Sequence, residues 1–237
     1  MIKLENVDVY GWEAAIRGMR NPMNSWDKSD SGKGCTRKNW GGEVTSTCEY
    51  CEYIRGDKIS QCHSNKFIIG QNDIKLMKSL SKAGNDHAKF LRMINVTVDI
   101  TAPLYWWKEF DTYKVGTVAN SCSTMHKIHE KEFTLDDFSH EHLGGELNED
   151  SLDWLEGTID LLNRKRQVFL LTKGKDYWWQ MIQLLPSSYN QKRTVQLNYQ
   201  VLKSMYHARK NHKLDCWVHF CEWIETLPYA KELICFD

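Results

Sequence analysis

The stretch that decides the fold runs from residue 185 to residue 209 and reads LPSSYNQKRTVQLNYQVLKSMYHAR. Its proline, Pro186, ends a helix predicted over 175–185, and the residues after it predict a second helix over 190–212. Residues three and four apart share a face of a helix. Between apolar residues that can pack, this helix carries a polar series made of Asn198, Gln200, Ser204 and Arg209. The spacing alone fits either a ligand-binding face or an ordinary surface helix.

In the rest of the chain, the sequence predicts that the strands all lie in the first half and that the second half is mainly helical. Strands are predicted over 2–10 and 90–101, where apolar residues alternate. Residues 115–126 suit a loop around a ligand, and the charged segment 127–150 is predicted to lie at the surface. Helices are predicted over 13–19, 73–82 (with Asp73 as N-cap and Gly84 as stop signal), 104–113, 151–167, 175–185, 190–212 and 215–226. This order of elements indicates an α+β protein.

The composition is typical of a globular protein, and we predict a single domain spanning residues 1–237. Lys+Arg and Asp+Glu both number 31, so the formal net charge is zero. A neutral chain does not favour an extended groove for nucleic acid, which needs excess positive charge. The sequence has no apolar run of about 18 residues, so we expect no membrane span. The polar start, without a secretory segment, and the eight cysteines, read as reduced thiols or metal ligands, predict a cytoplasmic protein.

The stretch quoted above resembles the nucleotide-binding helix of the flavin-dependent thymidylate synthases. Asn198, Leu202 and Arg209 match the family pattern, at the family's distance from the Leu-Pro pair. Gln200 stands where the family has Arg, and Ser204 where it has Asn or His. The resemblance implies a thymidylate-synthase-complementing-protein-like α+β fold, with a mixed sheet and a helical C-terminal half. A second stretch supports it, comprising Gly84 to His87, Phe90 and Ala102-Pro103-Leu104.

The resemblance also implies an activity and its participants. The residue that matches Arg209 binds the pyrimidine of dUMP in this family and polarises it for hydride transfer from reduced FAD. Methylenetetrahydrofolate supplies the carbon and NADPH reduces the flavin, and the family assembles as a homotetramer. By the same resemblance, Asn198, Gln200 and Ser204 line the flavin, while Ser123 and Lys114 hold phosphate or flavin, with Ser123 assigned beside Arg209 to the catalytic set.

The family's Arg-His-Arg signature is altered in this chain. Thr112, Tyr113 and Lys114 stand at its positions, and Asn120 and Ser123 replace the later Asn and Ser after one inserted residue. Thr112 and Tyr113 lack the charged or ring donors that hold the flavin, and Lys114 lacks the planar fork of Arg. The alteration is compatible with changed flavin binding, with a different pyrimidine reaction such as hydroxymethylation, or with a catalytically silent nucleotide-binding protein.

Glu109 stands where the family often has Gln near the dUMP site. A carboxylate only accepts hydrogen bonds, so Glu109 would favour an amine or a hydroxyl on the substrate. A solvated helix face is an equally good interpretation of this residue.

Four cysteines within an irregular insertion, about residues 24–66, form a candidate zinc site. They are Cys35, Cys48, Cys51 and Cys62, with His63 as an alternative ligand. Cys48 and Cys51 have the C-x2-C spacing with which two thiolates bind one tetrahedral zinc. Free thiols in a loop are the competing interpretation.

Overall fold

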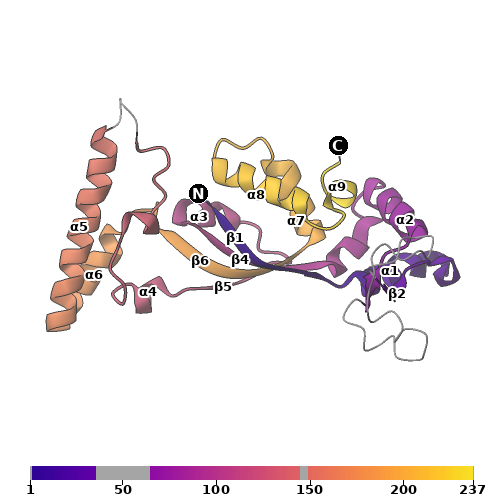
Figure 1. Cartoon of the computed structure of the whole chain (residues 1–237), viewed down its shortest axis with the longest axis horizontal. Coiled ribbons are helices and arrows are strands. Elements are labelled where there is room, and N and C mark those ends of the chain that lie inside the picture. Colours follow the sequence, from indigo (N-terminus) through magenta and orange to yellow (C-terminus); the bar gives the residue numbers. More distant parts are fainter. Residues whose placement is uncertain (1, 36–64, 145–148, 237) are drawn as a thin grey trace, which may run out of the picture.

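The computed structural model describes residues 2–35, 65–144 and 149–236, and a four-stranded sheet forms its centre. The order across the sheet is β1-β4-β6-β5, so strands from both halves of the chain lie side by side. Figure 1 shows an elongated molecule with this sheet along its middle. The strands are β1 (Lys3–Tyr10), β4 (Asn95–Pro103), β5 (Val118–Ser121) and β6 (Asn190–Asn198).

Strands β4 and β6 form the middle of the sheet because both carry apolar residues at alternate positions, which all point to one face. The buried positions are Val96, Val98, Ile100, Val195 and Leu197. The prediction of a helix over 190–198 is therefore wrong, since residues 190–198 pair with residues 95–103 over their whole length. The α+β class is confirmed. The sheet is antiparallel in every pairing that the structure describes, rather than mixed.

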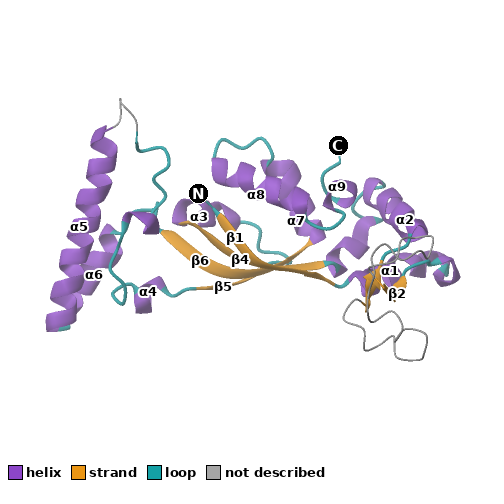
Figure 2. Ribbon diagram, viewed as in Figure 1, coloured by secondary structure: helices purple, strands orange, loops and turns teal. Residues whose placement is uncertain are grey.

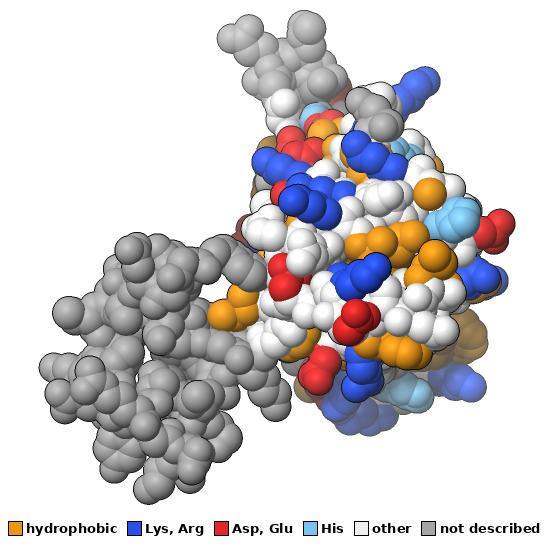
Figure 3. Space-filling model, turned by 90° about the vertical axis from the view of Figure 1, so that its right-hand side faces the viewer, with side chains coloured by type: hydrophobic (Ala, Val, Ile, Leu, Met, Phe, Trp, Pro, Cys, Tyr) orange, Lys and Arg blue, Asp and Glu red, His pale blue; other side chains and the backbone are white. Residues whose placement is uncertain are grey.

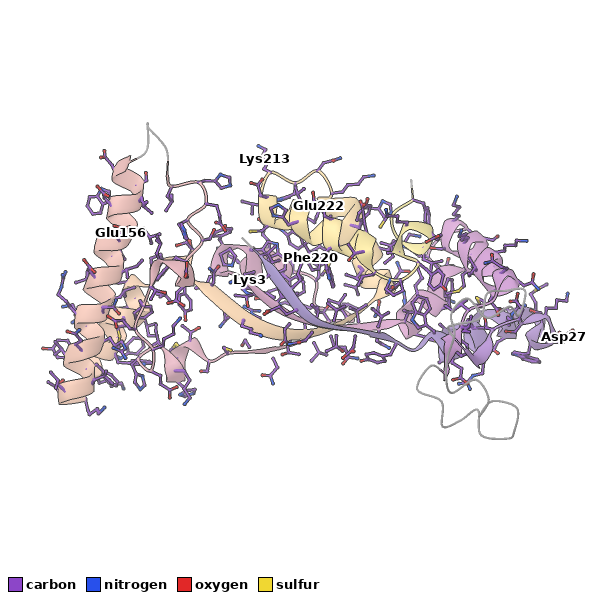
Figure 4. The ribbon with its side chains drawn as sticks, in the orientation of Figure 1. Lys3, Asp27, Glu156, Lys213, Phe220 and Glu222 are labelled. Carbon is purple, nitrogen blue, oxygen red and sulfur yellow. The ribbon has the colours of Figure 1, made fainter. Side chains whose placement is uncertain are left out.

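Three helices cover the buried face of the sheet: α3 (Leu104–Phe110), α7 (Tyr199–Arg209) and α8 (Asp215–Thr226). Figure 2 shows them on one side of the strands. The core between the layers is aromatic, with the ring centroid of Trp106 4.9 Å from that of Trp217 and 5.6 Å from that of Phe220. Phe220 lies on the sheet-facing side of α8 (Figure 4). The helix predicted over 215–226 is confirmed, and the one predicted over 104–113 is shorter.

Helices α5 (Glu149–Thr172) and α6 (Lys175–Leu184) form a two-helix arm at one end of the molecule, with α5 outermost (Figure 1). The arm has its own core, separate from that of the sheet. Segment 127–150 contributes Ile128, Phe133 and Phe138 to this core, so the prediction that it lies wholly at the surface is wrong. These three apolar residues are five positions apart, a spacing that matches neither a helix nor a strand.

The opposite end of the molecule is built from α1 (Trp12–Arg20) and α2 (Gln71–Lys82). A buried ion pair joins them, with Arg20 Nε 2.7 Å from Asp73 Oδ1. Asp73 is therefore a buried residue inside α2 and not its N-cap, which is Gly70. Hydrogen bonds from Ser29, Ser31 and Arg20, together with the charge of Arg20, hold the pKa of Asp73 below its usual value in spite of burial. Positive and negative side chains are interspersed on this end (Figure 3).

The remaining elements are short. The pair β2 and β3 is antiparallel; β2 lies within the cysteine-rich insertion and β3 begins at its end. The 3-10 turn that precedes β4 occupies the start of the strand predicted over 90–101. The bounds are β2 (Gly32–Cys35), β3 (Asn65–Ile68), α4 (Thr124–Lys127), α9 (Ala230–Leu233) and 3-10 turns at Asn21–Met23, Trp26–Lys28, Ala88–Met93 and Leu135–Asp137.

Candidate functional site

Helix α7 places Asn198 and Arg209 of the polar series at its two ends, with Gln200 in its first turn and Ser204 at its middle. Asn198 is its N-cap, and its side-chain oxygen accepts a hydrogen bond of 3.1 Å from the backbone N–H of Val201. This cap ends β6 and starts the helix, because an Asn oxygen satisfies one of the free N–H groups of the first turn. Arg209 is the last residue of the helix. Eleven residues at about 1.5 Å each separate the two ends by roughly 16 Å.

At the C-terminal end of α7, the side chain of Arg209 contacts residues at the C-terminal end of α3. Its Nη1 donates to Glu109 Oε2 at 2.9 Å, and its Nε donates to the Tyr113 hydroxyl at 3.1 Å. The guanidinium carbon also lies 4.8 Å from the ring centroid of Trp217, a distance that gives a cation–π contact. With 21% of its side chain exposed, Arg209 is fixed but still reachable from solvent.

Glu109 is the centre of this cluster. Its Oε2 accepts from Trp217 Nε1 at 3.0 Å as well as from Arg209, and His212 Nε2 lies 3.5 Å away. His212 Nδ1 accepts from the backbone N–H of Leu214 at 3.1 Å, so in the neutral ring the proton is on Nε2, which faces Glu109. Glu109 is 34% exposed but is engaged in this cluster, where its carboxylate balances the charge of Arg209.

At the N-terminal end of α7, two buried polar atoms have no hydrogen-bond partner among the described residues. They are Gln200 Oε1 and Thr117 Oγ1, although Gln200 Nε2 donates to Asn85 Oδ1 at 3.2 Å. The loop that carries Thr117 lies against this end of the helix. Gly116 has a φ of +78°, and a Cβ at its position would come within 3.0 Å of Asn198 Nδ2. Trp106 Nε1, His129 Nδ1, Asn190 Oδ1 and His219 Nδ1 are also without a partner among the described residues, but only Gln200 and Thr117 belong to this end of α7. Their two oxygen atoms are available to hydrogen-bond a ligand.

Several residues that the resemblance assigns to a flavin use their side chains inside the protein. The Thr112 hydroxyl donates to the Glu109 backbone oxygen at 2.7 Å, and that of Ser204 to the Gln200 backbone oxygen at 3.1 Å. The Tyr113 hydroxyl accepts from Arg209, as described above. Two other residues so assigned, Lys114 and Asn120, are exposed, with Asn120 on β5.

Ser123 lies apart from the Arg209 cluster, and no hydrogen bond within the described residues joins the two. Its hydroxyl caps α4 by accepting from the backbone N–H of His126 at 3.1 Å. The loop before α4 is held by Gln191, whose Nε2 donates to the Cys122 backbone oxygen at 3.0 Å. Arg193 then connects Gln191 Oε1 (2.9 Å) to Asp111 Oδ1 (2.7 Å) at the end of α3.

Sequence reasoning missed the connection through Gln191 and Arg193. It also assigned neither His212 nor Trp217 to the site, whereas the structure brings both into the Arg209 cluster. The connection through Gln191 and Arg193 had a signal in the sequence. Once residues 190–198 are recognised as a strand, these polar residues lie at alternate positions next to the buried Val195.

The candidate zinc site lies outside the described residues, apart from the backbone of Cys35 in β2. Within the described ranges, no group of His, Cys, Asp or Glu is arranged to hold a metal ion. Burial raises the pKa of two further cysteines, that of the buried Cys221 to about 12 and that of the half-buried Cys235 to about 11. Such thiols are poor nucleophiles and poor metal ligands at neutral pH.

No protein-family model and no curated protein matches this sequence. Solved structures do match it, and they define the class of fold: the architecture is that of the flavin-dependent thymidylate synthases (ThyX) and a related nucleotide methylase.

The matching structures cover nearly the whole chain. One is thymidylate synthase X from Helicobacter pylori with FAD and dUMP, at a TM-score of 0.62 and 14% identity over 99% of this chain and 97% of that one. A second structure of the H. pylori enzyme with FAD and dUMP gives a TM-score of 0.60 at 14% identity over 97% and 98%. The UMP/dUMP methylase PolB from Streptomyces cacaoi, bound with 5-Br dUMP, gives 0.57 at 11% identity over 100% and 96%. At these identities the likeness shows the fold alone.

Proposed function

We propose that this protein is a pyrimidine-nucleotide enzyme that binds FAD and methylates dUMP reductively to dTMP. The observation that carries the proposal is the Arg209 cluster at the C-terminal end of α7. A guanidinium held by Glu109, Tyr113 and Trp217, and still partly exposed, is suited to bind the oxygen atoms of a pyrimidine ring. The fold supports it, since the matching structures were solved with dUMP or its bromo analogue.

In this proposal Arg209 binds and polarises the base. A fixed cation stabilises negative charge that develops on the ring during attack, because its orientation costs nothing at that moment. Glu109 and Trp217 orient the guanidinium, and Glu109 sets how much of its charge is available. The exposed Lys114 and the capping residue Ser123 are the candidates for holding a phosphate.

The N-terminal end of α7 fits a flavin ring through its two unpartnered atoms. A flavin carries an N–H donor between carbonyl acceptors, which Gln200 Oε1 and the Thr117 hydroxyl could match. Bound FAD would supply the hydride, with NADPH as reductant and methylenetetrahydrofolate as carbon donor, as the sequence resemblance implies. Asn198 and Ser204 would shape this end through the cap and the first turns of the helix rather than by direct hydrogen bonds.

A nucleotide-binding protein without flavin chemistry is the second candidate. It is favoured by Thr112 and Tyr113, whose hydroxyls are engaged inside the protein at two positions of the altered signature. Both candidates share the pyrimidine site at Arg209. They differ in whether FAD binds at the other end of α7.

Three further expectations accompany the proposal. Assembly into a homotetramer stays a prediction from the sequence resemblance. The cytoplasmic location and the zinc site stay predictions from the polar start and the cysteines of the sequence. Among the described helices, none combines the length and the apolar character that crossing a bilayer requires.

Calorimetric titration of dUMP, followed by an assay for dTMP with FAD, NADPH and methylenetetrahydrofolate, tests the proposal. Arg209→Ala should weaken dUMP binding about 100-fold, the effect of losing charge-assisted hydrogen bonds, and should abolish turnover. Arg17→Ala, at an exposed position of α1, is the matched control and should change neither. Binding of dUMP without dTMP formation or FAD uptake would select the second candidate. Equal dUMP affinity in the wild type and in Arg209→Ala would contradict both candidate functions.

A further inference from the structure

The outer helix of the arm carries an apolar stripe that is exposed at Trp154 and half-buried at its other residues. Trp154, Leu161 and Val168 on α5 are seven positions apart, so they lie along one side of the helix. The arm's own core uses another side, through Leu155, Ile159 and Leu162. Trp154 is 79% exposed, and Leu171, one turn beyond Val168, is 86% exposed. Leu161 and Val168 are half-buried, and Leu171 lies on a neighbouring line of the helix, so Trp154 is the exposed end of the stripe. An apolar side chain of this size and exposure on a helix face is typical of a contact surface.

The stripe is also shaped for a helix. Asp150, Asp153, Trp154, Gly157 and Thr158 line a shallow hollow at its N-terminal end. Gly157 has no side chain to fill the hollow, and an added Cβ there would meet no atom within 4 Å. A side chain from another helix could enter the hollow beside Trp154, the way a knob fits a hole between helices.

Charge is divided along α5 in a way that is complementary to itself. The first half of the helix is acidic, with Asp150, Asp153, Glu156 and Asp160. The second half and the following turn are basic, with Arg164, Lys165, Arg166, Lys173 and Lys175. A helix with this pattern attracts a copy of itself that runs in the opposite direction and repels one that runs in parallel.

We propose that α5 pairs antiparallel with α5 of a second copy of this chain, about a two-fold axis at Leu161. A two-fold contact uses the same surface on both copies, which suits a stripe that is apolar at its centre and opposite in charge at its ends. Leu161 then meets its equivalent, and Trp154 of one copy meets Val168 of the other, because 154 + 168 equals twice 161. The inference does not rest on the proposed function.

One pair of charges gives the arrangement a specific prediction. Asp160 and Arg164 are four residues apart, so they flank the same side of the stripe, and no described residue forms an ion pair with either. With the axis at Leu161, Asp160 of one copy lies opposite residue 162 of the other, within one helical turn of its Arg164. The contact occurs twice in each pair.

Light scattering after size-exclusion chromatography at low salt tests the proposal with charge reversals. Asp160→Lys or Arg164→Glu alone should halve the assembled mass, since each variant places like charges opposite each other. An equimolar mixture of the two variants should restore the wild-type mass, because every contact is then between opposite charges. Glu156→Lys, an equal charge change turned away from the stripe, is the control and should keep the wild-type mass (Glu156 is labelled in Figure 4).

The mixing step separates this contact from a general loss of folding, because a misfolded variant cannot be rescued by another one. A wild-type protein that is monomeric at all concentrations would overturn the proposal. So would single variants that keep the full mass, or a mixture that stays at half mass.

Discussion

The two ends of α7 differ in how completely the protein satisfies its own polar groups. At the C-terminal end, Arg209 is paired with Glu109 and Tyr113 and rests on the ring of Trp217. At the N-terminal end, Gln200 Oε1 and Thr117 Oγ1 are buried without partners. An unsatisfied buried group costs about 1–3 kcal/mol, so the N-terminal end is the part of the site that a ligand would complete. The C-terminal end is already organised without one.

Replacing Trp217 should give the largest effect, at the organised end. Trp217 is fully buried against Trp106 and Phe220, and Trp217→Ala should lower the free energy of unfolding by about 3–5 kcal/mol through the cavity it leaves. Chemical denaturation followed by circular dichroism measures this loss. Trp179→Ala, at a position that is 42% exposed, should cost much less. Equal losses of unfolding free energy in the two variants would show that the Arg209 cluster is not supported by a tightly packed aromatic core.

Gly116→Ala should give the next largest effect, at the other end of α7. A residue with a side chain is strained at a φ of +78°, and its Cβ would press on Asn198, so we expect a loss of about 1–2 kcal/mol in unfolding free energy. We also expect weaker uptake of FAD, because the loop that carries Thr117 must shift. Gly144→Ala, where the Cβ meets nothing within 4 Å, is the matched control for the same denaturation experiment. A stable Gly116→Ala variant with normal FAD uptake would contradict the role given to this loop.

Glu109→Gln should raise the affinity for dUMP. The amide keeps an acceptor for Trp217 Nε1 but removes the negative charge that balances Arg209, so the guanidinium can interact more strongly with the nucleotide. We expect roughly a tenfold lower Kd by calorimetry, which corresponds to about 1.4 kcal/mol. Asp111→Asn removes a carboxylate at the end of α3 that pairs with Arg193 instead, and it should leave the Kd unchanged. If Glu109→Gln weakens dUMP binding, Glu109 contacts the substrate directly.

Gln200→Leu should give the smallest change in stability, and in the opposite direction. The substitution removes the unpartnered Oε1, and although it also removes the 3.2 Å hydrogen bond to Asn85, we expect the unfolding free energy to stay level or to rise by up to about 1 kcal/mol. The affinity for FAD should fall about fivefold, as expected for one lost hydrogen bond. Gln183→Leu, exposed on α6, controls for the loss of an amide. A variant that loses stability but keeps its FAD affinity would assign Gln200 a purely structural role.

The sequence predicted the elements whose apolar residues follow one clear period. The alternation in β4 and the patterns of α1 and α8 come from burial on one side of the element, which leaves a direct trace in the residues. Strand β6 was mistaken for helix because only Val195 and Leu197 show its alternation, while Lys192, Arg193 and Gln196 also fit a polar helix face. Residues 190–198 form a strand because they pair with β4, and no local sequence pattern reveals this pairing.

The candidate site was predictable in part for a similar reason. Arg209 and Asn198 were identified because they lie on one continuous stretch with a recognisable spacing. The partners that give Arg209 its orientation come from α3 and α8, and no spacing along the chain links Glu109 with Trp217. Whether a buried amide such as that of Gln200 finds a partner is decided by packing and cannot be read from sequence.

The flavin content of the purified protein tests the central claim most directly. The visible absorption spectrum is recorded first on the protein as isolated. It is recorded again after the protein has been incubated with FAD and dUMP and the free ligand has been removed. The difference between the two ends of α7 predicts a yellow protein in which the amount of bound FAD is proportional to the amount of protein chain. The Gln200→Leu variant should retain less FAD per chain. A colourless protein that takes up no FAD, with or without dUMP, would contradict the proposal of a flavin enzyme on this fold.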